Sequence, residues 1–192
     1  MSVEFYNNNS TSFYESTKDV DMSTLYDEFL PAIKTNGSIL DAGCGSGRDS
    51  LNFKNLGYQV SAFDASEALV KLATDLLNQT VELATFDSFK TNKTFDGIWA
   101  CASLLHVAKN ELPATFKKLT ELLNNRGVFY CSFKYGKQTI EREERVFTNL
   151  NEMLLENSIA NTGLHINKTW VTADQRPGRE NEKWLNAILV KG

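Results

Sequence analysis

The chain is poor in the residues that build metal centres and disulfide frameworks. Only two histidines and three cysteines occur among its 192 residues. The cysteines, Cys44, Cys101 and Cys131, are odd in number, and none lies near a second cysteine at the spacing of metal ligands. His165 also has no acid or cysteine at such a spacing. We therefore expect no metal site, and the cysteine count favours a reducing compartment.

Long hydrophobic runs are absent as well. No stretch of about 18 consecutive apolar residues occurs, so the sequence predicts no membrane-spanning helix. The N-terminal sequence MSVEFYNNNS lacks the basic and then apolar segments of a secretory signal. With 42% hydrophobic and 23% charged residues, the composition is that of a soluble globular protein, which we expect in the cytoplasm.

Basic residues are not in excess either. The formal net charge is −4 at pH 7. Proteins that bind a nucleic-acid backbone usually concentrate Lys and Arg, so the charge argues against nucleic acid as the main partner. A local basic patch is still compatible with this charge.

From residue 37 onward the chain alternates between strand and helix patterns. Short apolar runs end at turn signals, and the segments between them have the apolar period of a helix. The predicted strands cover residues 38–41, 58–63, 81–86, 95–102, 128–133, 164–172 and 183–190. The predicted helices cover residues 25–33 with a bend at Pro31, 46–56, 66–78 and 110–124, with one more around 150–154.

This order of elements predicts an α/β fold with a mostly parallel sheet. Parallel neighbours need long crossover connections, which the intervening helices provide. Only about ten residues separate the last two strands, so we expect them to form an antiparallel hairpin. Residues 37–192 then form a single domain, and residues 1–36 form an N-terminal arm and helix that cover the cleft. Residues 1–20 are polar, which suits a loosely ordered arm, but their four aromatic residues also suit a cover for the cleft.

The most informative stretch is ILDAGCGSGRDS, which follows the first predicted strand. Glycine stands at Gly43, Gly45 and Gly47, which lets a ligand approach the bare backbone beside a helix N-terminus. In a dinucleotide fingerprint counted from Gly43, the last glycine position falls on Arg48, so the match fails. Asp41, ahead of the loop, suits a ligand with a cationic end and repels a pyrophosphate.

Two further acids follow the next two predicted strands. Asp64 lies about 20 residues after the first loop glycine, where a carboxylate accepts hydrogen bonds from ribose hydroxyls. Asp87, in the sequence TFDSF, is placed to accept from an adenine amino group. A ligand with an amine, a ribose and a base but no phosphate has the chemical groups of S-adenosylmethionine.

With these motifs the sequence resembles the class I S-adenosylmethionine-dependent methyltransferases. The motifs are ILDAGCGSGRDS, VSAFDAS, FDSF, FDGIWACASLLHV and GVFYCSFK, in that order. The resemblance implies a Rossmann-like, doubly wound sheet of seven strands in the order 3-2-1-4-5-7-6, with strand 7 antiparallel. Within the family, GSGRDSL and LLHV are similar to the small tellurite-resistance-type and related small-molecule methyltransferases.

The resemblance also implies roles for individual residues. Asp41 and the loop would line the methionine end of the cofactor, Asp64 the ribose, and Asp87 with its neighbours the adenine. Residues just past the fourth strand would lie near the sulfonium. The predicted cofactor-binding set is Asp41, Gly43, Cys44, Gly45, Arg48, Asp64, Ala65, Asp87, Ser88, Phe89, Ala102 and Ser103.

The acceptor side is less marked in the sequence. His106 is a candidate base and substrate contact, although a histidine between Leu and Val is often only structural. Tyr14, Lys134 and Tyr135 are further candidate substrate contacts. Tyr6, Phe13 and Tyr14 are expected to shield the sulfonium, because aromatic faces attract cations. The EREER segment at 141–145 has the pattern of a solvated face, yet residues 134–148 are also able to fold over the cleft.

We therefore expect methyl transfer to a small molecule, leaving S-adenosylhomocysteine. No Asn-Pro-Pro-aromatic motif of amino-directed nucleic-acid enzymes follows strand four, where Ala102-Ser103-Leu104-Leu105 stands. Methylation of RNA or protein is the alternative within enzymes, and a cofactor-binding domain without turnover is another. A nicotinamide oxidoreductase is disfavoured by Arg48 at the expected glycine position.

Overall fold

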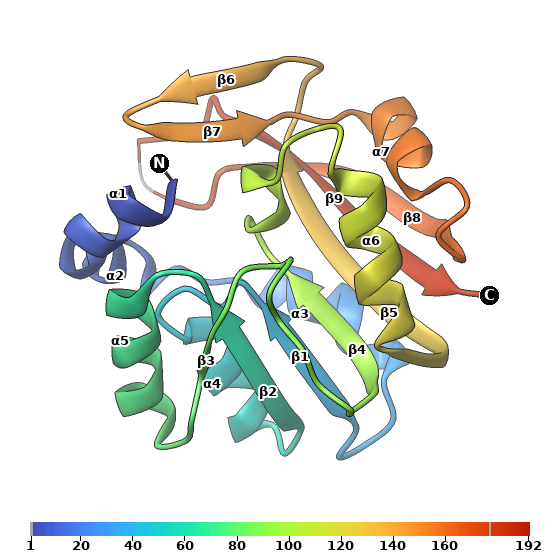
Figure 1. Ribbon diagram of the computed structural model, residues 1–192, viewed down its shortest axis with the longest axis horizontal. Helices are drawn as coiled ribbons and strands as arrows, with labels where there is room; N and C mark the ends of the chain where they lie inside the picture. The colour runs from blue at the N-terminus through green and yellow to red at the C-terminus, as the bar shows by residue number, and fades with distance from the viewer. Residues whose placement is uncertain (1, 177) are drawn as a thin grey trace.

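The computed structural model describes residues 2–176 and 178–192. Its main sheet has seven strands in the order β3-β2-β1-β4-β5-β9-β8 (Figure 1). The strands are β1 (Ser38–Ala42), β2 (Gln59–Asp64), β3 (Glu82–Leu83), β4 (Phe95–Ala100), β5 (Leu123–Lys134), β8 (Leu164–Ala173) and β9 (Lys183–Lys191). The pairs β5–β9 and β8–β9 are antiparallel, and the other pairs are parallel.

The predicted topology is confirmed. The last two predicted strands are β8 and β9, and β9 lies between β5 and β8 as strand 7 does in the expected order. The numbering differs because a small separate hairpin, β6 (Thr139–Arg142) and β7 (Arg145–Thr148), precedes them. The third strand is shorter than predicted: only Glu82 and Leu83 pair with β2, and both are exposed at the sheet edge.

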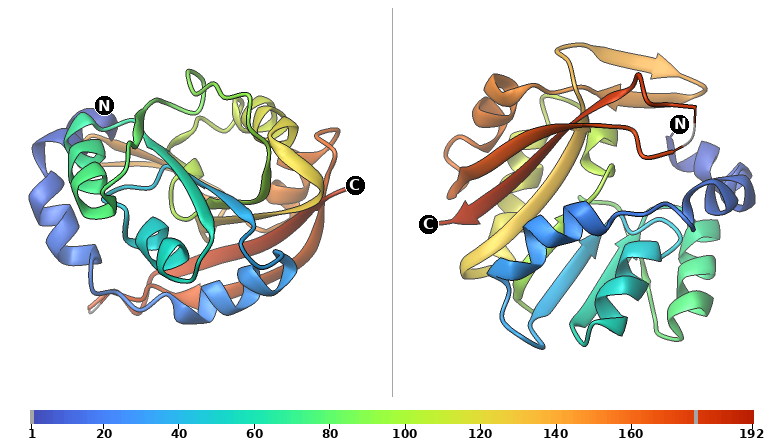
Figure 2. Two further views of the ribbon diagram at one scale, coloured as in Figure 1. Left: turned by 90° about the horizontal axis from the view of Figure 1, so that it is seen from below. Right: turned by 180° about the vertical axis from the view of Figure 1, so that it is seen from behind.

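Helices cover both faces of the sheet (Figure 2). Alternate residues of β1 point to opposite faces, so Ile39 packs in the cluster that contains α3 and α4, whereas Leu40 packs in the cluster that contains α6 and α7. The helices are α1 (Ser2–Asn8), α2 (Ser10–Thr17), α3 (Ser23–Phe29), α4 (Arg48–Asn55), α5 (Glu67–Leu77), α6 (Leu112–Glu121) and α7 (Glu152–Ile159). Two 3-10 turns, η1 (Leu30–Ala32) and η2 (Leu104–His106), complete the set.

The expectation of a loosely ordered N-terminal arm is wrong, because residues 2–17 form α1 and α2 with one break. Contacts with distant parts of the chain hold these helices. The side-chain oxygen of Asn7 accepts a hydrogen bond of 2.7 Å from the hydroxyl of Ser66, the N-cap of α5. Figure 1 shows α1 beside the end of α5, at the edge of the sheet where the parallel strands terminate.

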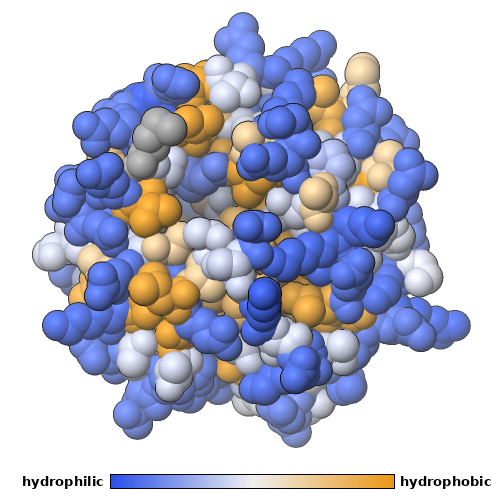
Figure 3. Space-filling view, viewed as in Figure 1, coloured by the Kyte–Doolittle hydropathy of each residue, from blue (hydrophilic) through white to orange (hydrophobic). Residues whose placement is uncertain are grey.

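On the face shown in Figure 3, the outer surface is mostly hydrophilic, as expected when the apolar residues are buried between the sheet and the helices on its two faces. Hydrophobic residues form small, separate groups there. Within the described part of the chain, no helix is long and apolar enough to cross a bilayer.

Candidate active site

The glycine loop is held tightly against the chain that leaves β4. Gly43 has a φ of +81°, and a Cβ there would lie 2.5 Å from Cβ of Ser103. The hydroxyl of Ser103 donates a 2.7 Å hydrogen bond to the carbonyl oxygen of Ala42. Gly45 has a φ of +57°, and its Cβ would approach the ring of Phe13 on α2. The loop thus keeps its backbone bare between β4 and the N-terminal helices.

Asp64 ends β2 and faces this loop. Its carboxylate accepts the backbone N–H of Gly45 at 2.8 Å and that of Ser66 at 2.9 Å. Burial raises the pKa of Asp64, and these backbone hydrogen bonds oppose that shift. The carboxylate is therefore fixed in orientation beside the loop, with lone pairs left for a ligand.

Asp41 is the next-to-last residue of β1 and is only 2% exposed. Its carboxylate accepts a 2.6 Å hydrogen bond from the hydroxyl of Ser50 on α4. Burial raises the pKa of Asp41 to about 8, with a further contribution from the negative charge of Asp49. A cationic ligand next to Asp41 would compensate this unfavourable burial.

Arg48 and Asp49 form an ion pair at the start of α4, with Arg48 Nε 2.6 Å from the Asp49 carboxylate. Asp49 also accepts from the Tyr26 hydroxyl at 2.7 Å and from Trp99 Nε1 at 2.8 Å. Burial alone would raise the pKa of Asp49, but Arg48 and these hydrogen bonds lower it. Arg48 also donates to the carbonyl oxygen of Thr17, so the pair ties α2 to the glycine loop.

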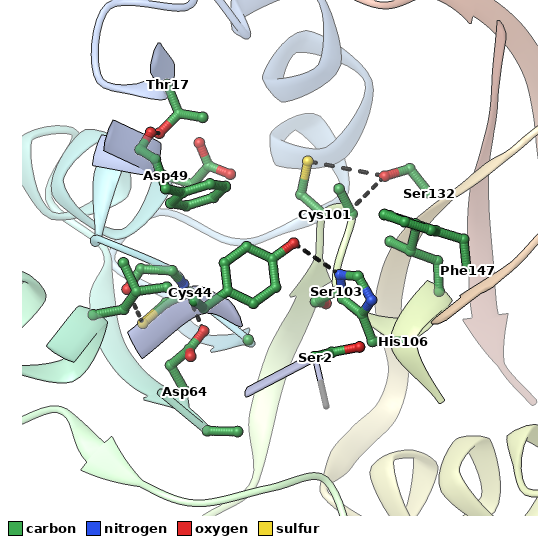
Figure 4. A pocket seen from close by; sticks show the side chains of 18 of the residues that line it. Ser2, Thr17, Cys44, Asp49, Asp64, Cys101, Ser103, His106, Ser132 and Phe147 are labelled. Carbon is green, nitrogen blue, oxygen red and sulfur yellow. Dashed lines mark hydrogen bonds between the residues drawn. The ribbon is translucent and has the colours of Figure 1, made fainter. Parts of the chain in front are cut away.

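These groups line a cavity of about 570 Å³ at the carboxyl ends of the parallel strands. Twelve of the sixteen predicted cofactor and substrate contacts line this one cavity. They are Asp41, Gly43, Cys44, Gly45, Arg48, Asp64, Ala65, Asp87, Ala102, Ser103, His106 and Lys134. Figure 4 shows Cys44 and Asp64 on one side of it and His106, Ser132 and Phe147 on the other.

The structure does not bring the other four predicted residues to the cavity. Phe89 is buried in the core, stacked on Phe63 with ring centroids 4.3 Å apart. Ser88 closes a turn with Thr85, and the ring of Tyr14 lies near Lys18. Tyr135 is 41% exposed and donates to Glu152.

His106 occupies the opposite wall from Asp64. Its Nδ1 lies 2.8 Å from the carbonyl oxygen of Val146, and its Nε2 lies 3.0 Å from the hydroxyl of Tyr6 on α1. Because a carbonyl only accepts, Nδ1 carries the proton and Nε2 accepts from Tyr6. Burial lowers the pKa of His106, and the charges of Arg145 and Lys134 lower it further. The imidazole is neutral, with its basic nitrogen toward Tyr6.

Residues 14–166 match a protein family described as "Methyltransferase domain". The chain belongs to this methyltransferase family. The recognition of a class I S-adenosylmethionine-dependent methyltransferase is thereby confirmed, and with it the enzyme class and the cofactor.

The relatives of this methyltransferase are distant. An "Uncharacterized methyltransferase" of Staphylococcus carnosus is 28% identical over 67% of this chain and 67% of its own length. The "Probable S-adenosyl-L-methionine-dependent methyltransferase TehB" of Haemophilus influenzae is 26% identical over 58% of this chain and 41% of its own length. The chain thus spans less than half of the second relative. The fold is shared with a 1,6-didemethyltoxoflavin-N1-methyltransferase of Burkholderia thailandensis, at a TM-score of 0.75 and 19% identity, covering 99% of this chain and 88% of that one.

The cavity of the methyltransferase fits S-adenosylmethionine. The bare loop at Gly43 and Gly45 leaves room that a Cβ would fill. Asp41, Asp64 and Asp87 all contribute carboxyl groups to the lining of the cavity. Among the described residues, no group of three or more His, Cys, Asp or Glu side chains is arranged to hold a metal ion.

Sequence reasoning missed two parts of the methyltransferase site. Asp49 was not singled out, because its partners Tyr26 and Trp99 are far from it in the sequence. The interpretation of residues 141–145 as a solvated face is wrong for Arg145, which lies on β7 with its side chain only 15% exposed and lines the cavity. The mixed charges of this segment are typical of an exposed surface and gave no sign that Arg145 is buried, although the next two residues, Val146 and Phe147, are apolar.

Proposed function

We propose that this methyltransferase transfers the methyl group of S-adenosylmethionine to a small molecule held in the same cavity as the cofactor. The observation that carries the proposal is that the cavity is covered by structure. The helices α1 and α2 and the hairpin β6–β7 all contribute to its lining, and its volume of about 570 Å³ lies within the usual range for small ligands. A cavity lined from these sides favours a small acceptor over a folded protein or an RNA duplex.

Each wall of the cavity has a distinct part in this proposal. Asp41 and the backbone at Gly43 and Gly45 hold the amino acid end of the cofactor. Asp64 accepts from the ribose hydroxyls, and Asp87 accepts from the adenine. Ala102 lies at the sulfonium, where its φ of +51° and the hydrogen bond from its N–H to Ser132 fix the backbone.

When bound, S-adenosylmethionine supplies an electrophilic methyl group and departs as S-adenosylhomocysteine. The main task of the chain is to hold the acceptor in line with the methyl–sulfur bond and to exclude water. Tyr6, Phe13 and Phe147 are among the aromatic residues that line the cavity. If the acceptor atom carries a proton, Nε2 of His106 takes it once the Tyr6 hydroxyl has turned away.

The small-molecule proposal has support outside the chain. The Burkholderia thailandensis structure contains 1,6-didemethyltoxoflavin together with S-adenosylhomocysteine. Methylation of RNA or protein, and cofactor binding without turnover, are the competing functions. We also propose that the protein is located in the cytoplasm and that its partner is a small molecule and not a nucleic acid.

Two measurements test it in sequence. Calorimetry with S-adenosylhomocysteine and with NAD as separate ligands first tests the cofactor, and we expect binding of S-adenosylhomocysteine alone. A panel of small amines, phenols and carboxylates, with total RNA and a protein mixture as separate arms, is then screened for release of S-adenosylhomocysteine. Release with a small molecule supports the proposal, whereas release with RNA or protein alone overturns it.

A further inference from the structure

The cavity has two ends of opposite charge. The end at the glycine loop carries Asp41, Asp64 and Asp87, which the proposed function uses for the cofactor. The lining of the end formed by β5, the β6–β7 hairpin and the β8–β9 strands with their connection includes five cations and one acid, Asp174. These cations are Lys134, Arg142, Arg145, Arg176 and Arg179.

Several of these cations are neutralised by acids of the same region. Arg176 pairs with Asp174 at 2.6 Å. Lys134 lies 2.6 Å from Glu182, and Arg179 lies 3.8 Å from the same carboxylate. Because these cations are already paired with carboxylates, little of their positive charge is available to a ligand.

Arg145 differs from them. Its terminal nitrogen pairs with the exposed Glu143, but its Nε is buried and has no hydrogen-bond partner among the described residues. The guanidinium lies 3.8 Å from the ring centroid of Phe5 and 5.2 Å from that of Phe147. Aromatic faces thus fix the plane of this cation while one of its donors stays unused, which is unfavourable unless a ligand accepts from it.

The position of Arg145 relates it to the acceptor. The residue that follows it, Val146, supplies the carbonyl that orients His106, and the charge of Arg145 lowers the pKa of that histidine. Arg145 thus lies close to His106, on the side of the cavity proposed for the acceptor.

We propose that Arg145 binds a carboxylate of the methyl acceptor, so that the acceptor is a small organic anion. This rests on the proposed function. The planar guanidinium fork matches a carboxylate and binds it through two N–H groups. An anion at this end is attracted by the positive charge of the sulfonium in the same cavity, which favours the simultaneous binding of both.

Benzoate and benzamide, which are similar in shape and differ in charge, are the probes. Each is titrated by calorimetry into protein saturated with S-adenosylhomocysteine. We expect benzoate to bind at least tenfold more tightly than benzamide, and Arg145→Gln to remove most of that preference. Arg126→Gln is the matched control, because it removes the same charge from an exposed residue outside the cavity lining. Equal binding of the two probes, or undiminished benzoate binding by Arg145→Gln, overturns the proposal.

The fold of each variant is checked by its affinity for S-adenosylhomocysteine, which we expect to stay within about twofold of the parent. If Arg145→Gln does not fold, Arg145→Lys takes its place, since it keeps the charge and loses the fork. Benzoate binding must then fall severalfold, and unchanged binding overturns the proposal. A parent protein that binds no S-adenosylhomocysteine contradicts the proposed function itself, which separates that failure from the loss of the carboxylate site.

Discussion

The hydroxyl of Tyr6 donates a hydrogen bond to Nε2 of His106 over 3.0 Å, joining two residues that are 100 positions apart in the chain. This contact closes α1 onto the acceptor wall of the cavity. It also stabilises the neutral form of His106, because only the unprotonated Nε2 accepts from a phenol. The tautomer is fixed from the other side by the carbonyl of Val146.

The first prediction concerns this hydrogen bond. Tyr6→Phe removes a donor to the neutral imidazole, so the pKa of His106 rises. The measurement is a pH titration of the His106 imidazole resonances by NMR. Tyr14→Phe, on the neighbouring helix but away from the cavity, should leave the titration of His106 unchanged. An unaltered His106 titration in Tyr6→Phe would show that the phenol does not act on the histidine in solution.

The second prediction concerns the ribose site. Asp64→Ala should weaken binding of S-adenosylhomocysteine by about 1–3 kcal/mol, the usual cost of losing hydrogen bonds to a charged group. Calorimetry measures the loss, and circular dichroism confirms that the variant folds. Asp75→Ala is the control, because Asp75 is an exposed acid on α5 outside the cavity. If Asp64→Ala folds and binds as the parent does, the ribose assignment is wrong.

The fold and the grouping of the three acids at one end of the cavity were predictable from sequence for the same reason. Parallel strands place their carboxyl ends at one edge, so residues after successive strands meet there. Asp41, Asp64 and Asp87 could therefore be brought together without coordinates. The hairpin of β8 and β9 followed from the shortness of its connection.

The cover of the cavity was not predictable in this way. Helix α1 has a polar sequence, and what fixes it are contacts that no local pattern shows, such as the bond between Asn7 and Ser66. Arg145 was hidden for a related reason. Within EREER each charged residue has another charged residue as a sequence neighbour, so the sequence does not single out Arg145. Only the pairing of β6 with β7 and the contact with the ring of Phe5 distinguish Arg145 from its neighbours.

The third prediction separates the two demands on Gly43, which are its positive φ and its lack of a side chain. Gly43→Ala should lower the free energy of unfolding by more than the roughly 1–2 kcal/mol that a left-handed backbone costs an alanine, because its Cβ also meets Ser103 at 2.5 Å. Gly178 is the matched control: its φ of +78° is similar, but an added Cβ has nothing within 4 Å. Urea unfolding of both variants gives the difference, which measures the clash. Equal losses in Gly43→Ala and Gly178→Ala would mean that Ser103 moves aside at no cost.

The fourth prediction follows from the buried carboxyl of Asp41, whose pKa is raised from an ordinary value of 3.8 to about 8. The native state therefore keeps a proton that the unfolded chain releases above about pH 4, so the contribution of Asp41 to stability is complete below that pH. It is lost as the pH rises toward 8, at up to about 1.4 kcal/mol per pH unit. Asp41→Asn, which keeps the shape and cannot ionise, should flatten this fall in urea unfolding measured from pH 5 to pH 8 without ligand. Because a cation beside Asp41 favours the charged form, S-adenosylhomocysteine should also reduce the slope in the parent protein. Parallel pH profiles for the parent and Asp41→Asn would show that Asp41 is ionised in the free protein throughout this range.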